Sequence, residues 1–160
     1  MAGASVGAGA AAQAALGVGG SPRTTAREWA AVLEQVPLFE PLSRRHLRRV
    51  TSLARARRFQ GGVPVVVAGR PGDAFYVILD GRASVGVPGR RARRLGPGDY
   101  FGEMALLDDA PRSATVTADE ELLVLEIGRA GFGRLLKQEP QIGLALLRVL
   151  AARVRSLERE

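Results

Sequence analysis

The spacing of hydrophobic residues changes near residue 60 of the chain. Before that point apolar residues recur at intervals of three and four, which is the spacing of one helix face. This spacing predicts a helix over residues 25–36, ended by Pro37, and a second helix over residues 43–56, capped by Ser43. The shared apolar sides consist of Trp29, Val32, Leu33 and Val36 in the first helix, and of Leu47, Val50 and Ala54 in the second.

Beyond residue 60 the apolar residues gather in short runs rich in β-branched side chains. Gly and Pro turns separate these runs, and both Arg70–Asp73 and Gly96–Asp99 place Pro second and Gly third, as a type II turn requires. Closely spaced short strands of this kind predict an antiparallel sandwich or barrel. The predicted strands are residues 63–67, 74–79, 83–87, 113–118 and 121–127.

Two further helices are predicted at the C-terminal end, over residues 132–137 and from residue 141 to about 159. The last helix carries apolar residues at intervals of three, four and three, as in the seam of a coiled coil. Because the seam covers only about two heptads, packing against the chain's own barrel and formation of a homodimer both explain it. Its residues are Leu147, Leu150, Val154 and Leu157.

Residues 1–22 are rich in Ala and Gly, and we predict a disordered tail there followed by one domain over residues 23–160. Glycine raises the entropy cost of ordering, and alanine offers little area to bury. A signal peptide is the competing interpretation, because Ala12-Gln13-Ala14 looks like a cleavage site. The tail lacks a basic n-region, however, which argues against that interpretation.

The composition narrows the possibilities further. Of 160 residues, 46% are hydrophobic and 24% charged, which is typical of a single soluble globular domain. Cysteine is absent, which excludes disulfides, thiolate metal sites and cysteine nucleophiles, and we expect a cytoplasmic setting. No apolar run reaches the roughly 18 residues of a membrane-spanning helix, so we expect none.

The net charge of +7 is unevenly distributed. Residues 21–60 carry nine arginines and three glutamates, a balance of +6, whereas residues 61–160 carry fourteen basic and thirteen acidic residues. On the predicted second helix Arg44, Arg48 and Arg55 share a face, which a solvated surface explains. The other interpretation is that the stretch from Arg44 to Arg58 binds an acidic partner or nucleic acid.

The candidate chemistry lies in YFGEMALLDDAPRSATV, residues 100–116. Residues 102–106 fit one helical turn, whose free N–H groups bind anions, and Gly102 allows a ligand close to the backbone. Arg112 supplies a guanidinium fork suited to a phosphate, and Glu103 accepts hydrogen bonds from hydroxyl groups. Together they suit a sugar phosphate. Spacing alone leaves open that Glu103 and Arg112 simply neutralise each other.

The segment FGEMALLDDAPRSATV fills every place of the pattern F-G-E-aliphatic-A-L, a short loop, and R-(S/T/A)-A-(T/S)-V. It resembles the phosphate-binding cassette of cyclic nucleotide-binding domains, the family of protein kinase A regulatory subunits, cyclic-nucleotide-gated channels and the catabolite activator protein. Upstream, GRPGDAFYVILDGRASV resembles the family's strand pair, and Phe39 resembles its usual lead-in. The resemblance implies a mainly β fold with flanking helices: an antiparallel β jelly roll (double-stranded β-helix) with N-terminal helices and a long C-terminal helix.

Carried over position by position, the resemblance implies a role for each residue of the cassette. Glu103 would accept the ribose 2′-hydroxyl and Arg112 would bind the exocyclic phosphate oxygens, supported by the Ala105 N–H and the Ser113 hydroxyl. One residue of the last helix would cover the base. The candidate binding residues are Gly102, Glu103, Met104, Ala105, Arg112, Ser113 and Ala114, and the candidate base-covering residues are Leu144, Leu147 and Leu150.

The resemblance implies a cAMP-binding regulatory domain in which ligand binding moves the C-terminal helix and so signals to an effector protein. We expect cAMP rather than cGMP, because cGMP binders of the family often have Thr at the position of Ser113. We expect no enzyme activity, cofactor or metal, since His46 is the only histidine and has no evident catalytic partner. No helix-turn-helix follows the last helix before Glu160, so we expect no DNA-binding domain.

Overall fold

The computed structural model describes residues 26–36, 39–40 and 42–159 of the chain. The tail predicted for residues 1–22 and Pro37 lie outside the described residues. The predicted end of the first helix is nevertheless wrong, because the helix ends at Leu33 and residues 34–36 are not helical. The helices are α2 (Ala26–Leu33), α3 (Arg44–Leu53), α4 (Glu103–Asp108), α5 (Arg129–Gln138) and α6 (Pro140–Glu158). The strands are β1 (Ala54–Phe59), β2 (Pro64–Val66), β3 (Ala74–Asp80), β4 (Ala83–Gly86), β5 (Arg93–Leu95), β6 (Tyr100–Phe101), β7 (Thr115–Ala118) and β8 (Leu122–Gly128).

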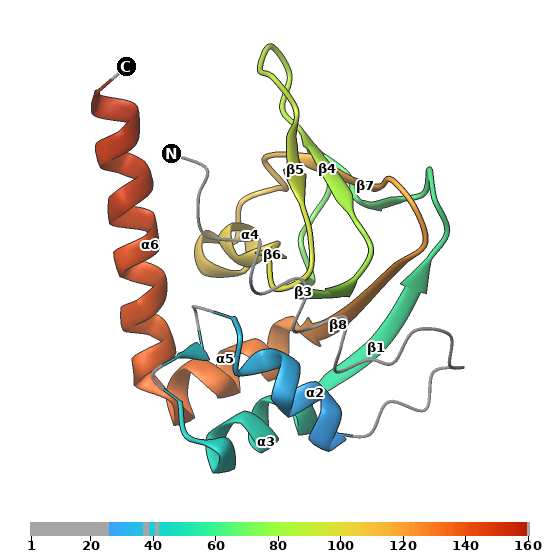
Figure 1. The fold of residues 1–160 in the computed structure, drawn as a ribbon. Coiled ribbons are helices and arrows are strands. Elements are labelled where there is room, and N and C mark those ends of the chain that lie inside the picture. The colour runs from blue at the N-terminus through green and yellow to red at the C-terminus, as the bar shows by residue number, and fades with distance from the viewer. Residues whose placement is uncertain (1–25, 37–38, 41, 160) are drawn as a thin grey trace.

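The strands form two four-stranded sheets that enclose a common interior (Figure 1). One sheet has the order β1-β8-β3-β6 and the other the order β2-β7-β4-β5. Every strand pair in the described part of the chain is antiparallel. The predicted antiparallel sandwich is therefore confirmed.

Strands β3 and β8 are apolar on both faces because each face meets a different hydrophobic core. Tyr76 and Ile78 of β3 point into the core between the two sheets. The alternate residues Phe75 and Val77 point the other way, into a core that the helices cover. This position explains why residues 74–79 form an unbroken apolar run instead of alternating with polar residues.

Helices α2, α3 and α5 gather at one side of the sandwich, and α6 extends away from them (Figure 1). The ring of Phe132 in α5 lies against that of Phe75, with centroids 5.2 Å apart. Near its start α6 buries Ile142 and Leu146. The apolar side predicted for the first helix is confirmed, with Trp29 partly buried and with full burial of Val32, Leu33 and Val36.

The predicted boundaries of the second helix are wrong at its C-terminal end. Helix α3 is capped by Ser43 as predicted, but it ends at Leu53, and the chain continues at once into strand β1. The register of β1 runs from Ala54 opposite Ile127 to Phe59 opposite Leu122. Arg55 therefore belongs to a strand and does not share a helix face with the arginines of α3.

Of the two predicted type II turns, one is confirmed and one is wrong. Gly98 has a φ of 89°, and the amide of Asp99 donates to the carbonyl of Gly96 across 3.0 Å. In the other segment Gly72 lacks a positive φ; the left-handed residue is Gly69, at 83°. The turn there lies earlier in the chain, because the amide of Arg70 donates to the carbonyl of Val67.

Strand β1 is stabilised by ion pairs with a single acid on β8. Nη2 of Arg55 and Nη1 of Arg57 lie 2.7 and 2.6 Å from the two carboxylate oxygens of Glu126. Burial alone would raise the pKa of Glu126, but the hydrogen bonds from these arginines outweigh burial and lower it. The carboxylate therefore stabilises the folded state in its ionised form.

We predict that Glu126→Gln lowers the free energy of unfolding at pH 7 by about 1–3 kcal/mol, because two arginines lose their charged acceptor. The pKa of Glu126 is lower in the folded than in the unfolded chain, so its stabilisation is present above the ordinary glutamate value of about 4.3 and is lost as pH falls. Denaturant unfolding between about pH 6 and pH 3 should show the two stabilities converging. The exposed Glu120→Gln is the control, and a gap that widens on acidification would contradict the assignment.

Candidate functional site

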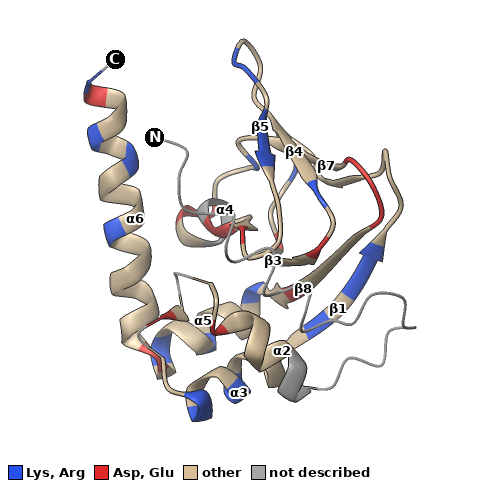
Figure 2. Ribbon diagram, viewed as in Figure 1, with Lys and Arg blue, Asp and Glu red and all other residues tan. Residues whose placement is uncertain are grey.

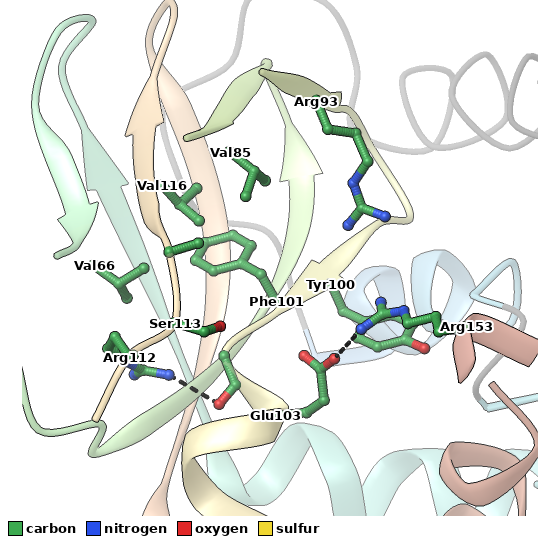
Figure 3. Close-up of a pocket in the computed structure, with 12 residues that line it drawn as sticks. Val66, Val85, Arg93, Tyr100, Phe101, Glu103, Arg112, Ser113, Val116 and Arg153 are labelled. Carbon is green, nitrogen blue, oxygen red and sulfur yellow. Dashed lines mark hydrogen bonds and ion pairs between the residues drawn. The ribbon is translucent and has the colours of Figure 1, made fainter. Parts of the chain in front are cut away.

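A pocket opens at the junction of β6 and α4, between the two sheets (Figure 3). The empty space at this site, open mouth included, is about 530 Å³. Part of the lining is apolar and comes from the core between the sheets, and charged side chains reach the pocket from several elements (Figure 3). The apolar residues are Val66, Val85, Phe101 and Val116, and the charged ones are Arg93, Glu103, Arg112 and Arg153.

Gly102 stands between β6 and α4 in a left-handed conformation, with φ at 93°. A Cβ at this position would lie 2.7 Å from Nη1 of Arg112 and 2.8 Å from the carbonyl oxygen of Ala74. We expected Gly102 to admit a ligand to the backbone. Within the protein itself, the left-handed backbone, the nearby carbonyl of Ala74 and the approach of Arg112 together require a glycine here.

Arg112 is held almost entirely by backbone groups, although it is only 6% exposed. Its Nη1 donates to the carbonyl of Gly102 at 2.9 Å and its Nη2 donates to the carbonyl of Ala74 at 2.7 Å. Its own amide donates to the carbonyl of Arg70, and its carbonyl accepts from the amide of Gly69. No carboxylate pairs with Arg112 among the residues that the structure describes, so its positive charge stays available to an anion.

The surroundings of Arg112 make its charge costly without a ligand. Burial is the largest influence and lowers the pKa of Arg112, and the positive charge of Arg129 acts in the same direction. The groups Tyr76, Asp73 and Glu103 oppose this shift. An arginine remains protonated at neutral pH even so, because its ordinary pKa lies far above neutrality. A buried, unpaired cation favours binding of an anionic ligand, because the ligand's charge and hydrogen bonds replace the water that the cation lost on burial.

Glu103 is the second buried charge of the pocket, and it pairs with α6 rather than with Arg112. Its Oε1 accepts a hydrogen bond from Nη1 of Arg153 across 3.1 Å, and the Glu103 side chain is 5% exposed (Figure 3). The open question of whether Glu103 and Arg112 neutralise each other is thereby answered. Tyr100 lies beside this pair, and burial, followed by the charge of Glu103, raises the pKa of its hydroxyl.

The structure brings most of the predicted binding residues together. Five of them line the pocket, whereas Met104 and Ala105 fall in the first turn of α4. Ser113 is exposed and follows directly on the buried Arg112. The five pocket residues are Gly102, Glu103, Arg112, Ser113 and Ala114.

Two charged residues of the pocket escaped the sequence analysis. Arg93 comes from β5, a three-residue strand within an arginine-rich run that gave no apolar signal. Arg153 comes from α6, and helical spacing was a usable signal for it. It follows the buried Ile142 by eleven residues and Leu146 by seven, so all three lie on one helix face.

The candidate base-covering leucines lie away from the pocket. Leu144 and Leu147 are 55% and 63% exposed, and the residue of α6 that lines the pocket is Arg153. The predicted seam of α6 is likewise largely exposed instead of being packed against the sandwich, since Val154 and Leu157 are also exposed.

The single histidine of the chain pairs with an acid. His46 lies on α3 with Nδ1 3.5 Å from Oε2 of Glu139, in an ion pair that forms only when the histidine is protonated. Within residues 26–36, 39–40 and 42–159, no group of three or more histidine or acidic side chains is placed to hold a metal ion. Across the same described ranges, no helix has the length and apolar character that crossing a bilayer requires.

Comparisons with known proteins bear on this pocket directly. The profile of the cyclic nucleotide-binding domain matches residues 56–139. The chain is 40% identical over 113 residues to a cAMP-dependent protein kinase regulatory subunit of Aspergillus niger, covering 69% of this chain and 27% of the relative. It is 41% identical over 104 residues to a cGMP-dependent protein kinase of Toxoplasma gondii, covering 65% of this chain and 10% of the relative.

The fold is shared with solved structures as well. The cAMP-bound structure of PfPKA-R matches with a TM-score of 0.75 and 27% sequence identity, over 84% of this chain and 46% of the other. This likeness confirms the predicted jelly roll with N-terminal helices and a C-terminal helix. The chain spans about a quarter and a tenth of the two curated relatives, at 27% and 10% of their lengths. Because the matching profile extends from β1 through α5 and contains the cassette that places Arg112 and Glu103 in one pocket, the chain belongs to the cyclic nucleotide-binding domain family.

Proposed function

We propose that the chain binds a cyclic nucleotide, cAMP in the first place, and that it acts as a regulatory domain and not as an enzyme. The observation that carries this proposal is the buried guanidinium of Arg112, which lines the pocket without an acidic partner among the described residues. The names of relatives that include cAMP-dependent kinase regulatory subunits support the choice of ligand. A cytoplasmic setting remains a prediction.

Each charged residue suits a different part of the ligand. Arg112 has used two of its guanidinium N–H groups on carbonyls, and its remaining donors suit the exocyclic oxygens of a cyclic phosphate. Glu103 has a second carboxylate oxygen beside the one that Arg153 contacts, and it suits a ribose hydroxyl. The exposed Ser113 hydroxyl stands at the same rim and supports the phosphate. The valines and Phe101 offer an apolar surface to the nucleoside.

Regulation would act through the ion pair between Glu103 and Arg153. This pair joins the cassette to α6 across 50 residues of sequence. A ribose hydroxyl that donates to the second oxygen of Glu103 draws on the same negative charge that attracts Arg153, so ligand occupancy changes the strength of the ion pair that holds α6 in place. Binding then shifts the population of α6 positions in proportion to the ligand's preference between them.

A second candidate ligand is cGMP, and Arg93 favours it. The Arg93 side chain points from β5 into the pocket, on the side away from Arg112 (Figure 3). A guanidinium donates well to O6 and N7 of a guanine edge, whereas adenine presents an amino group beside its N7. A cGMP-dependent kinase among the relatives agrees with this choice.

The rival function, docking of an acidic partner or nucleic acid through the arginines between Arg44 and Arg58, loses support from the structure. Those residues are divided between α3 and β1, so they form no single helix face. Five of the seven arginines in this stretch pair with acids of the chain: Arg44, Arg49, Arg55, Arg57 and Arg58.

We predict that Arg112→Ala lowers the affinity for cAMP and cGMP by on the order of 100-fold or more, because the phosphate loses its charged donors. Arg112→Lys should recover only part of this loss, since a lysine keeps the charge without the planar fork. Isothermal titration calorimetry of both variants measures the effect, with the exposed Arg82→Ala as the control. If the wild-type chain takes up neither nucleotide, or if Arg112→Ala binds as tightly as wild type, the proposed function is wrong.

We predict that Arg153→Ala separates nucleotide binding from the response of α6. The affinity should stay within about tenfold of wild type, because Arg112 and Glu103 remain in place. The chain has no cysteine, so Ser156→Cys allows a single spin label on α6. Nucleotide should change the mobility of this label when Arg153 is present and leave it unchanged in the Arg153→Ala background. An equal change in both backgrounds would show that α6 responds by another route.

We predict that Arg93→Ala lowers the affinity for cGMP relative to that for cAMP by about tenfold or more, which is the usual discrimination of one bidentate base contact. Competition titrations of both nucleotides against a fluorescent analogue give the ratio directly. Arg94→Ala, on the same strand and exposed, is the matched control. If Arg93→Ala leaves the ratio of the two affinities unchanged, Arg93 gives no reason to favour cGMP.

A further inference from the structure

The face of α6 that points away from the sandwich carries an apolar stripe. Leu144, Leu147 and Val154 are more than half exposed, at 55%, 63% and 54%, whereas Ile142 and Leu146 on the opposite side are buried. The spacings of three and seven place the three exposed residues along one edge of the helix. Exposed apolar side chains that are aligned along one side of a helix mark an interaction surface, whereas singly scattered ones are ordinary.

A basic row runs beside this stripe. Arg148, Arg155 and Arg159 follow one another at intervals of seven and four, so they lie along one side of the helix. They line a shallow groove together with Ala151, Ala152 and Ser156. In Figure 2 the distal half of α6 is marked by basic residues, and Glu158 is the single acidic residue within the helix as described. The stripe and the row together form a surface that we call the outer face of α6.

We propose that the outer face of α6 binds an acidic amphipathic helix of a partner protein. The apolar stripe matches the apolar side of such a helix, and the basic row matches carboxylates along its edge, as in helix pairs whose flanking charges select the partner. The small side chain of Ala151, which lies between the stripe and the row, allows a second helix to approach closely there. The proposal goes beyond nucleotide binding, because nothing in this surface requires an occupied pocket.

The charges argue against the other occupants. A second copy of the chain would supply the same arginines and only one glutamate, leaving most of the basic row without acidic partners. The first 20 residues of this chain contain no charged side chain, so they provide no carboxylates either. An anionic membrane would favour a broadly basic polar face opposite an apolar face with bulky anchors such as Trp and Phe. Here the basic row borders one edge, and the outer face contributes Leu, Val and Ala.

The test uses the full chain without nucleotide and a designed fluorescent peptide as probe. The peptide is a helix of about three heptads with Leu at its two seam positions and Glu at the flanking ones. Fluorescence anisotropy should show binding that weakens as salt rises, and a peptide with Lys in place of Glu should bind at least about tenfold more weakly. Because nucleotide is omitted, failure of the proposed nucleotide binding would leave this result unaffected.

Variants locate the binding surface. Arg148→Glu combined with Arg155→Glu should weaken peptide binding at least about tenfold, and Leu147→Ser combined with Val154→Ser should do the same. The matched control reverses two exposed arginines of α3, Arg45→Glu with Arg48→Glu, and should leave binding unchanged. Thermal unfolding checks that each variant is folded, since all the substituted side chains are exposed.

Four results would overturn the proposal. The first is no binding of the acidic peptide at concentrations up to about 1 mM. The second is an equal loss of binding in the α3 control. The third is a stable homodimer in sedimentation equilibrium that the Leu147 and Val154 substitutions dissociate, because a second copy would then cover the face. The fourth is that anionic vesicles, and not the peptide, bind in a manner that depends on Arg148 and Arg155.

Discussion

The contact between the buried guanidinium of Arg112 and two backbone carbonyls determines the chemistry of the pocket. Ala74 begins β3 and Gly102 precedes α4, so the arginine joins segments that are distant in the sequence. A carboxylate in place of these carbonyls would have fixed the side chain equally well but would have cancelled its charge. Carbonyls fix it and leave the charge in place, and the fold carries the cost of burying it. The left-handed conformation at Gly102, which glycine adopts without strain, leaves room for this arrangement.

The two halves of the pocket differ in what holds them. The anion-binding half is built on the backbone of the sandwich, through hydrogen bonds that Arg112 makes with both its side chain and its main chain. The carboxylate half is held by Arg153 on α6, which packs closely only near its start. A ligand that spans both halves therefore contacts a site built on the sandwich and, through Glu103, changes the ion pair to a helix that packs closely only near its start. This asymmetry gives a physical basis for a helix that responds to occupancy while the phosphate site stays fixed.

Elements whose buried residues form a recognisable apolar pattern in the sequence were predictable. Elements that are held by contacts with distant segments were not. The apolar run of β3, the apolar side of α2 and the turn at Gly98 follow from local chemistry. Strand β1 consists of alanines, arginines and one phenylalanine, and it is recognisable only through Glu126 on its neighbour. The cassette motif located Arg112 and Glu103. Their actual partners, two carbonyls and Arg153, depend on tertiary contacts that no local pattern encodes.

Strands β3 and β8 belong at the same time to the core between the sheets and to the core beneath the helices. A fragment trimmed to the strands alone would expose the apolar side chains of Phe75, Val77 and Leu79 to water. A fragment of the helices alone would leave Phe132 without the sheet against which it packs. Neither half is therefore a viable minimal unit. Engineered sensors cut from this chain must keep both, and calorimetric melting should proceed as one event.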